Sequence, residues 1–127
     1  MALQINPLLD TNYLENAYGD DAMIIHMIFD AFLSDSLPRW YNLETALDNK
    51  DLDQAASILH GLKPSFTMAG LTWIRPKIEV MEVAVKEGTD ISILMDQYKE
   101  IAEEINKLMP ILETESERLS KVSFRSK

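Results

Sequence analysis

Apolar residues recur at intervals of three and four along most of the chain, and this spacing is the feature that most constrains the fold. No alternation of apolar and polar residues persists, and no Asn-Gly or Asp-Gly pair marks a tight hairpin turn. The 127 residues suffice for one compact core, and 46% of them are hydrophobic. The pattern therefore predicts a single-domain, all-α protein.

Five helical segments are predicted from the apolar stripes and from the residues that begin and end them. Asp10 and Asp51 are suitable N-caps for the first and third segments, and Gly70 and Gly88 are suitable ends for the third and fourth. Pro38 is predicted to bend or interrupt the long second segment. In chain order the segments cover about 10–18, 21–47, 51–69, 71–85 and 91–112.

Four long helices with short connections bury their apolar faces most simply as an antiparallel up-down four-helix bundle. We expect the short N-terminal helix to pack across one end of this bundle as a lid. The whole of 1–127 is interpreted as one domain, with the bundle over about 10–119. The polar residues of about 120–127 offer little to bury, so a frayed tail is predicted there.

Charge and composition argue against several classes of function. Lysine and arginine total 12 against 21 acidic residues, and a formal charge of -9 disfavours nucleic acids and anionic membranes as partners. The sequence has no cysteine, which removes disulfides and thiolate sites. No apolar run of about 20 residues and no secretory N-terminal pattern is present. These features predict a cytoplasmic protein that does not enter membranes.

His60 lies in the third predicted helix, on the side away from the apolar stripe. The stripe is centred near Leu59 and Phe66, and at about 100° per residue the imidazole points roughly 130° from that centre. We therefore expect His60 to be exposed to solvent. An imidazole with a reference pKa near 6.5 is largely neutral at pH 7, so a ring nitrogen can attack a phosphoryl donor without a dedicated base.

A more specific pattern follows His60. The segment HGLKPSFTMAG, which ends at Gly70, resembles the signature of histidine-containing phosphotransfer (HPt) domains, in which His-x-x-Lys-Gly precedes a hydrophobic residue and Gly. The spacing of His60, Leu62, Lys63 and Gly70 matches this signature. The resemblance implies that His60 accepts a phosphoryl group from a receiver-domain aspartate and passes it to another receiver, without binding a nucleotide.

The resemblance also implies roles for other residues and partners. Lys63 would steady the phosphohistidine, and Gly70 would end the helix before the next antiparallel helix. The implied partners are response-regulator receiver domains and a hybrid histidine kinase. The implied carrier is a monomer without kinase activity, and it needs no cofactor because Mg²⁺ belongs to the receiver. Independently of the family, Thr67 lies near enough to hydrogen-bond a phosphoryl oxygen, although helical threonines more often bond backbone carbonyls.

Pro64 departs from the HPt pattern, where a small glycine usually leaves space for the incoming receiver. Proline has no amide hydrogen for the carbonyl of His60, and its ring crowds that carbonyl, at a cost of up to about 3 kcal/mol. A local kink would either widen access to His60 or restrict which receivers dock. Pro64 therefore affects the docking geometry, and partner choice is predicted to depend on it.

Two other functions remain open from the sequence. An HPt-like bundle that binds receivers without carrying phosphoryl would tolerate Pro64 in place of glycine. A histidine kinase dimerisation domain also places a histidine on a helix, but that histidine is usually followed by an acidic residue, and here Gly61 follows. His26 lies among apolar residues and is interpreted as a packed or boundary histidine, and with two histidines in the chain no metal site is predicted.

Overall fold

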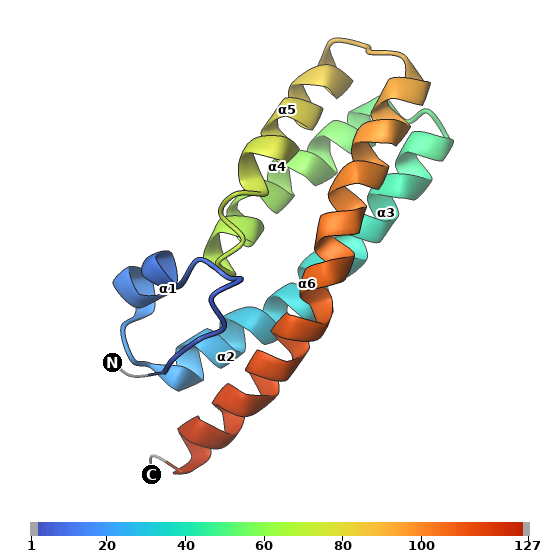
Figure 1. The fold of residues 1–127 in the computed structure, drawn as a ribbon. Helices are drawn as coiled ribbons and strands as arrows, with labels where there is room; N and C mark the ends of the chain where they lie inside the picture. The colour runs from blue at the N-terminus through green and yellow to red at the C-terminus, as the bar shows by residue number, and fades with distance from the viewer. Residues whose placement is uncertain (1–2, 126–127) are drawn as a thin grey trace.

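The computed structural model describes residues 3–125, and every regular segment within that range is helical (Figure 1). The all-α prediction is therefore confirmed for this part of the chain. One segment, η1, is a short π-helical turn between two α-helices. In chain order the elements are α1 (Thr11–Tyr18), α2 (Ala22–Ala31), η1 (Phe32–Ser36), α3 (Leu37–Asp48), α4 (Leu52–Met68), α5 (Arg75–Lys86) and α6 (Ile91–Arg125).

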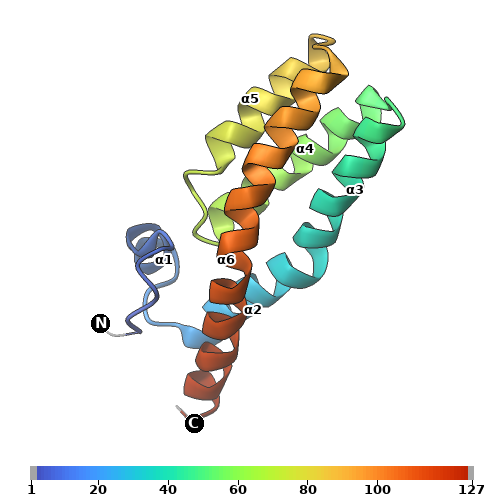
Figure 2. The same ribbon diagram turned by 45° about the vertical axis from the view of Figure 1, so that its right-hand side comes forward.

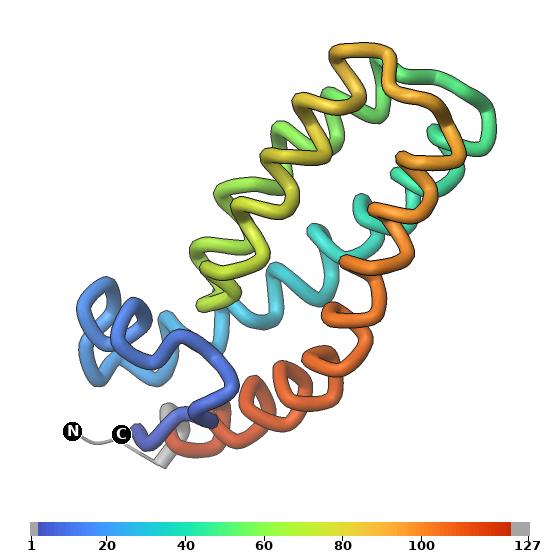
Figure 3. Tube along the Cα trace, turned by 45° about the horizontal axis from the view of Figure 1, so that its top comes forward, coloured from blue at the N-terminus to red at the C-terminus, as the bar shows by residue number. Residues whose placement is uncertain are grey.

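The helices form a continuous packed series. α4 packs against both α3 and α5, and the chain reverses direction at each connection between α3 and α6 (Figures 1 and 2). The long α6 passes α3 and α5 in its first half and lies beside α2 in its second half (Figure 3). α1 sits to one side of this assembly, next to α2 and the lower end of α4 in Figure 1.

An apolar cluster runs through the helices. Phe66 of α4 packs edge-to-face on Phe32, with ring centroids 5.1 Å apart, and Trp40 of α3 stacks on Tyr98 of α6 at 4.4 Å. These ring contacts add to the burial of large apolar surfaces. The predicted stripe of the third helix is fully buried from Ala55 to Ala69, including Leu59 and Phe66, while Leu52 at its start is partly buried. The opposite face of α4, which carries His60, is therefore left toward solvent.

The predicted disruption near Pro38 is confirmed, and it lies just before the proline. The Leu37 amide donates to the carbonyl of Phe32, five residues back, so the helix widens into the η1 turn. Pro38 then occupies the first turn of α3. Because proline lacks an amide hydrogen, it cannot continue the regular bonding of α2 and is best placed where a helix begins.

The start predicted for the fourth helix is wrong by several residues. We expected it at residue 71, whereas α5 begins at Arg75 and the residues between Gly70 and Arg75 form turns. Pro76 lies in the first turn of α5, where its missing amide hydrogen costs nothing. Leu71 and Ile74 are nevertheless buried. The apolar spacing therefore predicted which residues are buried, but it did not predict where the helix begins.

The end predicted for the last helix is also wrong. α6 continues past residue 112 to Arg125, through most of the segment expected to be a frayed tail, while residues 126 and 127 lie outside the described residues. The second half of α6 gains a partner in α2, and Leu119 is buried there. No helix among the described residues combines the length and apolar character needed to cross a membrane.

The N-terminal segment of residues 3–10 straps the helices together. The Asn6 amide donates to Oε2 of Glu115 on α6 at 2.9 Å, and the Asp10 amide donates to the carbonyl of Gly70 after α4 at 2.8 Å. The strap therefore links the residue that follows α4 to the second half of α6.

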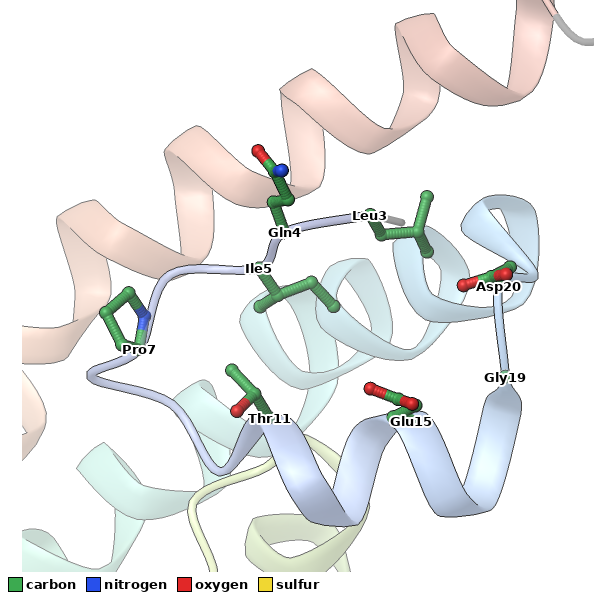
Figure 4. A pocket seen from close by; sticks show the side chains of 8 residues that line it. All are labelled: Leu3, Gln4, Ile5, Pro7, Thr11, Glu15, Gly19 and Asp20. Atoms are coloured by element: carbon green, nitrogen blue, oxygen red, sulfur yellow. The ribbon is translucent and has the colours of Figure 1, made fainter. Parts of the chain in front are cut away.

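A pocket of about 230 Å³ lies between this strap and α1 (Figure 4). Leu3 and Ile5 line it from the strap, and Thr11 and Glu15 line it from α1. None of the residues that the sequence singled out for chemistry lines this pocket. The candidate site therefore lies elsewhere, on α4 and α5.

Candidate functional site

His60 occupies the exposed face of α4, and 73% of its side chain is accessible. This confirms the exposure predicted from the helical phase. The helix that presents it starts at Asp51, whose side chain accepts a hydrogen bond from the Gln54 amide at 3.2 Å. This N-cap satisfies one of the free amides of the first turn. His60 therefore sits in the middle of a well-defined helix rather than in a loop.

Gly70 follows the C-terminus of α4, as predicted. Its φ of +80° lies in the left-handed region, and the next amide, of Leu71, donates back to the carbonyl of Phe66 at 2.9 Å. A Cβ at Gly70 would lie 2.9 Å from a side-chain carbon of Leu14 on α1. Glycine is thus required both by the backbone conformation and by the close approach of α1.

Glu82 of α5 faces the imidazole. Nδ1 of His60 lies 3.2 Å from Oε2 of Glu82, whose side chain is only 4% exposed. An ionised carboxylate only accepts hydrogen bonds, so this contact requires the hydrogen on Nδ1. In the neutral imidazole Nε2 then carries the lone pair, and it belongs to a ring that is largely open to solvent. A nucleophilic nitrogen and its orienting partner are therefore contributed by two adjacent helices.

Two lysines neutralise the buried carboxylate. Nζ of Lys63 lies 2.8 Å from Oε1 of Glu82, and Nζ of Lys86 lies 3.0 Å from Oε2. Lys63 also approaches Glu79 at 3.7 Å, and its side chain is only 15% exposed. The structure thus places Lys63 next to His60, as the motif spacing predicts, with its ammonium paired to Glu82.

The pKa values follow from these contacts. Burial raises the pKa of Glu82, but the hydrogen bonds from Lys63 and Lys86, together with their charges, outweigh it and lower the pKa to about 2. The hydrogen bond to Glu82 raises the pKa of Lys63. At neutral pH Glu82 is therefore an anion between two ammonium groups, which favours a hydrogen-bonded imidazole.

Pro64 lies on the exposed surface of α4, one turn after His60. The helix continues through it, although Pro64 has no amide hydrogen to donate to the carbonyl of His60. On the neighbouring face, Gly61 lies close to α3, because a Cβ there would be 3.4 Å from Nη1 of Arg39. The surface beside His60 is therefore shaped by a proline ring on one side and by Arg39 on the other.

Thr67 is directed toward its own helix and toward α5. Its hydroxyl donates to the carbonyl of Lys63 at 3.4 Å and accepts from Nη1 of Arg75 at 3.2 Å. This is the backbone-bonded arrangement that helical threonines favour. Lys77, two residues after Arg75 on α5, pairs with Glu104 on α6. Thr67 and Arg75 therefore lie together, and Lys77 belongs to another surface.

An apolar surface extends from α2 to the C-terminal half of α4. Met23 and Met27 of α2 and Met68 of α4 are exposed. A shallow depression of about 130 Å³ separates α2 and η1 from α4. Its lining consists of Ile28, Ala31, Phe32, Asp35, Ser36, Ser65 and Met68. Of the three methionines, Met68 belongs to this lining, and an exposed methionine beside a depression offers an adaptable contact.

Glu82 and Lys86 were missed by the sequence reasoning. A signal was present, because Glu82 follows Ile78 by four residues and precedes Val85 by three, and so stands at the edge of an apolar stripe. An acidic residue at such a position needs a partner. The partner could not be named from the sequence, since it comes from another helix.

His26 is partly buried between α2 and α6. Its Nδ1 donates to the carbonyl of Ser116 at 2.9 Å, and the Ser116 hydroxyl lies 3.0 Å away. This confirms the interpretation of His26 as a packed or boundary histidine.

In comparisons with known proteins, the chain matches no protein-family model, no curated protein and no solved structure.

Proposed function

We propose that the protein is a phosphorelay carrier of the HPt type, which accepts a phosphoryl group on His60 from one receiver domain and passes it to another. The observation that carries this proposal is the contact between the exposed imidazole of His60 and the buried carboxylate of Glu82. That contact holds the hydrogen on Nδ1 and leaves the lone pair of Nε2 toward solvent, where a partner can approach.

The transfer step is a displacement at phosphorus. The Nε2 lone pair forms a bond to the phosphorus of an aspartyl phosphate, and the bond from phosphorus to the aspartate oxygen breaks. The electron pair of that bond leaves with the aspartate carboxylate. The imidazole keeps its hydrogen on Nδ1 and becomes cationic, and the anionic Glu82 stabilises this charge. Transfer to the next receiver is the reverse step, with Mg²⁺ supplied by the receiver.

The arrangement of the helices supports the same proposal. We assign α3, α4, α5 and the first half of α6 as the antiparallel up-down four-helix bundle that an HPt domain requires, with α1 as the additional N-terminal helix (Figure 2). His60 lies near the middle of one of these four helices, and Glu82 lies on the next. The proposed carrier is a cytoplasmic monomer without kinase activity of its own.

The apolar surface beside the site is the proposed docking surface for receiver domains. It consists of the depression between α2, η1 and α4, with the exposed Met68 in its lining. Pro64 lies between Met68 and His60 along the same face of α4, at intervals of four residues. A receiver that covers Met68 would therefore also meet the proline ring, so we expect Pro64 to influence partner choice.

The decisive experiment is a labelling assay with three proteins. Wild type, His60→Gln and the control His26→Gln are incubated with hybrid kinases and receiver domains of the same organism and with radiolabelled ATP. We expect acid-labile label on wild type and on His26→Gln, and none on His60→Gln. Circular dichroism checks that His60→Gln keeps its fold, which is expected because the side chain is largely exposed. Equal label on wild type and His60→Gln would contradict the proposal.

A receiver-binding module without phosphoryl transfer is the second candidate, and Pro64 is the observation that favours it. It predicts that no receiver labels the wild-type protein and that receiver binding is the same for wild type and His60→Gln. A histidine kinase dimerisation domain would instead give a stable dimer in light scattering. We expect the mass of a monomer, and a stable dimer would count against the carrier.

A further inference from the structure

We propose that Lys86 is the ammonium group that binds the phosphoryl group on His60, while Lys63 remains as the counter-ion of Glu82. This inference rests on the proposed function and concerns the same site. It divides two roles between two lysines that contact opposite oxygens of one carboxylate. The motif alone assigns the phosphoryl contact to Lys63, so the inference changes which residue carries it.

Lys63 is held in place by its surroundings. Its Nζ lies 2.8 Å from Oε1 of Glu82 and 3.7 Å from Glu79, and its side chain is only 15% exposed. Moving this ammonium to a phosphoryl group would remove the closest partner of a carboxylate that is almost completely buried. An uncompensated buried charge is strongly unfavourable, so Lys63 is expected to stay with Glu82.

Lys86 is free to move and starts next to the imidazole. Its Nζ lies 3.0 Å from Oε2 of Glu82, the same oxygen that lies 3.2 Å from Nδ1 of His60. Its side chain is 60% exposed and pairs with Glu82, one turn earlier on α5, which Lys63 also neutralises. Four rotatable bonds allow the ammonium to leave Glu82 and reach the outer side of the ring.

Phosphorylation supplies the driving force for this movement. A phosphoryl group adds close to two negative charges and three acceptor oxygens to the exposed side of the imidazole. Before phosphorylation the carboxylate holds both ammonium groups, so one of them is in excess over its single charge. Transfer of Lys86 to the phosphoryl oxygens leaves Glu82 with Lys63 and with the hydrogen on Nδ1 of His60. Each anionic group then has a cationic partner.

Phosphoramidate tests this inference without any protein partner. The phosphorus–nitrogen bond of the reagent breaks as the bond from Nε2 to phosphorus forms, and ammonia leaves with the electron pair. The proteins compared are wild type, Lys86→Gln, Lys86→Arg and Lys107→Gln, an exposed lysine on α6 that matches the change in net charge. The initial rate of labelling on His60 is measured by phosphorus NMR, and circular dichroism checks each fold.

We expect Lys86→Gln to lower the labelling rate by about three- to tenfold, as for loss of one charge-assisted contact near the surface. Lys86→Arg should restore most of the rate, and Lys107→Gln should match wild type. A rate for Lys86→Gln equal to wild type, with His60 still labelled, would overturn the role of Lys86 and leave the carrier function intact. Absence of label from every protein would overturn both proposals.

The side-chain nitrogen resonances of the two lysines give a second readout. When His60 is phosphorylated, we expect the Nζ resonance of Lys86 to shift and that of Lys63 to change little. If Lys86 served only as an ion-pair partner of Glu82, phosphorylation would not shift its Nζ resonance, and Lys86→Gln would not change the labelling rate. A large shift of Lys63 with an unchanged Lys86 would reverse the assignment and contradict the inference.

Discussion

Nδ1 of His60 lies 3.2 Å from Oε2 of Glu82, so an exposed histidine of α4 is joined to a buried carboxylate of α5. One partner in this hydrogen bond is largely exposed to solvent, and the other is almost completely buried. The imidazole keeps access to solvent, while the carboxylate is ionised and held by Lys63 and Lys86. The ring is oriented by the protein and remains open to a partner, which is the requirement for a phosphoryl carrier.

Because Glu82 is ionised in the folded protein, we expect the free energy of unfolding to fall at acid pH. Its pKa falls from an ordinary 4.5 to about 2 in the folded protein, so its stabilising contribution is complete above about pH 4.5. As the pH falls from 4.5 toward 2, we expect this group alone to cost up to about 3 kcal/mol of unfolding free energy. Urea unfolding of wild type and Glu82→Gln, from about pH 7 to about pH 3, measures the difference.

The Glu82→Gln variant should be less stable than wild type at pH 7, by about 1–3 kcal/mol, because two ammonium groups lose their common partner. Its stability should then fall less steeply in acid than that of wild type. The exposed Glu87→Gln provides the control, with a pH profile parallel to wild type. Parallel profiles for wild type and Glu82→Gln would show that Glu82 does not titrate abnormally.

Gly70→Ala should destabilise the protein more than Gly88→Ala. Both glycines have positive φ, +80° and +74°, and alanine is strained at either position by about 1 kcal/mol. At Gly70 the new methyl group would also lie 2.9 Å from Leu14, whereas nothing lies within 4 Å at Gly88. We expect Gly70→Ala to lower the free energy of unfolding by about 2–4 kcal/mol and Gly88→Ala to lower it by about 1 kcal/mol. Thermal or urea unfolding measures both. Equal losses of stability in the two variants would show that Leu14 of α1 moves aside without a measurable loss of free energy.

Pro64→Ala should stabilise α4, because alanine donates an amide hydrogen to the carbonyl of His60. The expected gain in unfolding free energy is about 1–3 kcal/mol. Pro110→Ala in α6 is the matched control, since it removes another exposed proline from a helix interior. Both variants should be more stable than wild type, but only Pro64→Ala should alter the rate of transfer from a receiver. Equal transfer rates in all three proteins would remove Pro64 from the docking surface.

Arg118→Gln should loosen the N-terminal strap. Nε and Nη2 of Arg118 hold the buried Glu115, and Nη2 also donates to the carbonyl of Leu3 at 3.0 Å. Glu115 in turn accepts the Asn6 amide. We expect the free energy of unfolding to fall by about 1–3 kcal/mol and the Asn6 amide to exchange its hydrogen faster. The surface variant Lys121→Gln is the control, and we expect little change in either measurement. Unchanged exchange at Asn6 would show that the strap does not depend on Arg118.

The sequence by itself determined those features that depend on neighbouring residues in one helix. Apolar spacing identified the helical class and the buried side of α4, and with it the exposure of His60. Gly70 marked the end of α4, because a left-handed residue there follows from local chain chemistry. Pro38 marked the disruption between α2 and α3 for the same reason.

Only the tertiary structure decided the features that require a contact between distant helices. α6 extends to Arg125 because α2 covers its second half, and α5 begins at Arg75 although the buried Leu71 precedes it. The pairing of His60 with Glu82 joins residues 22 positions apart on two helices. Local periodicity gives the direction of each side chain around its own helix, whereas the partner that it meets depends on how the helices are packed together.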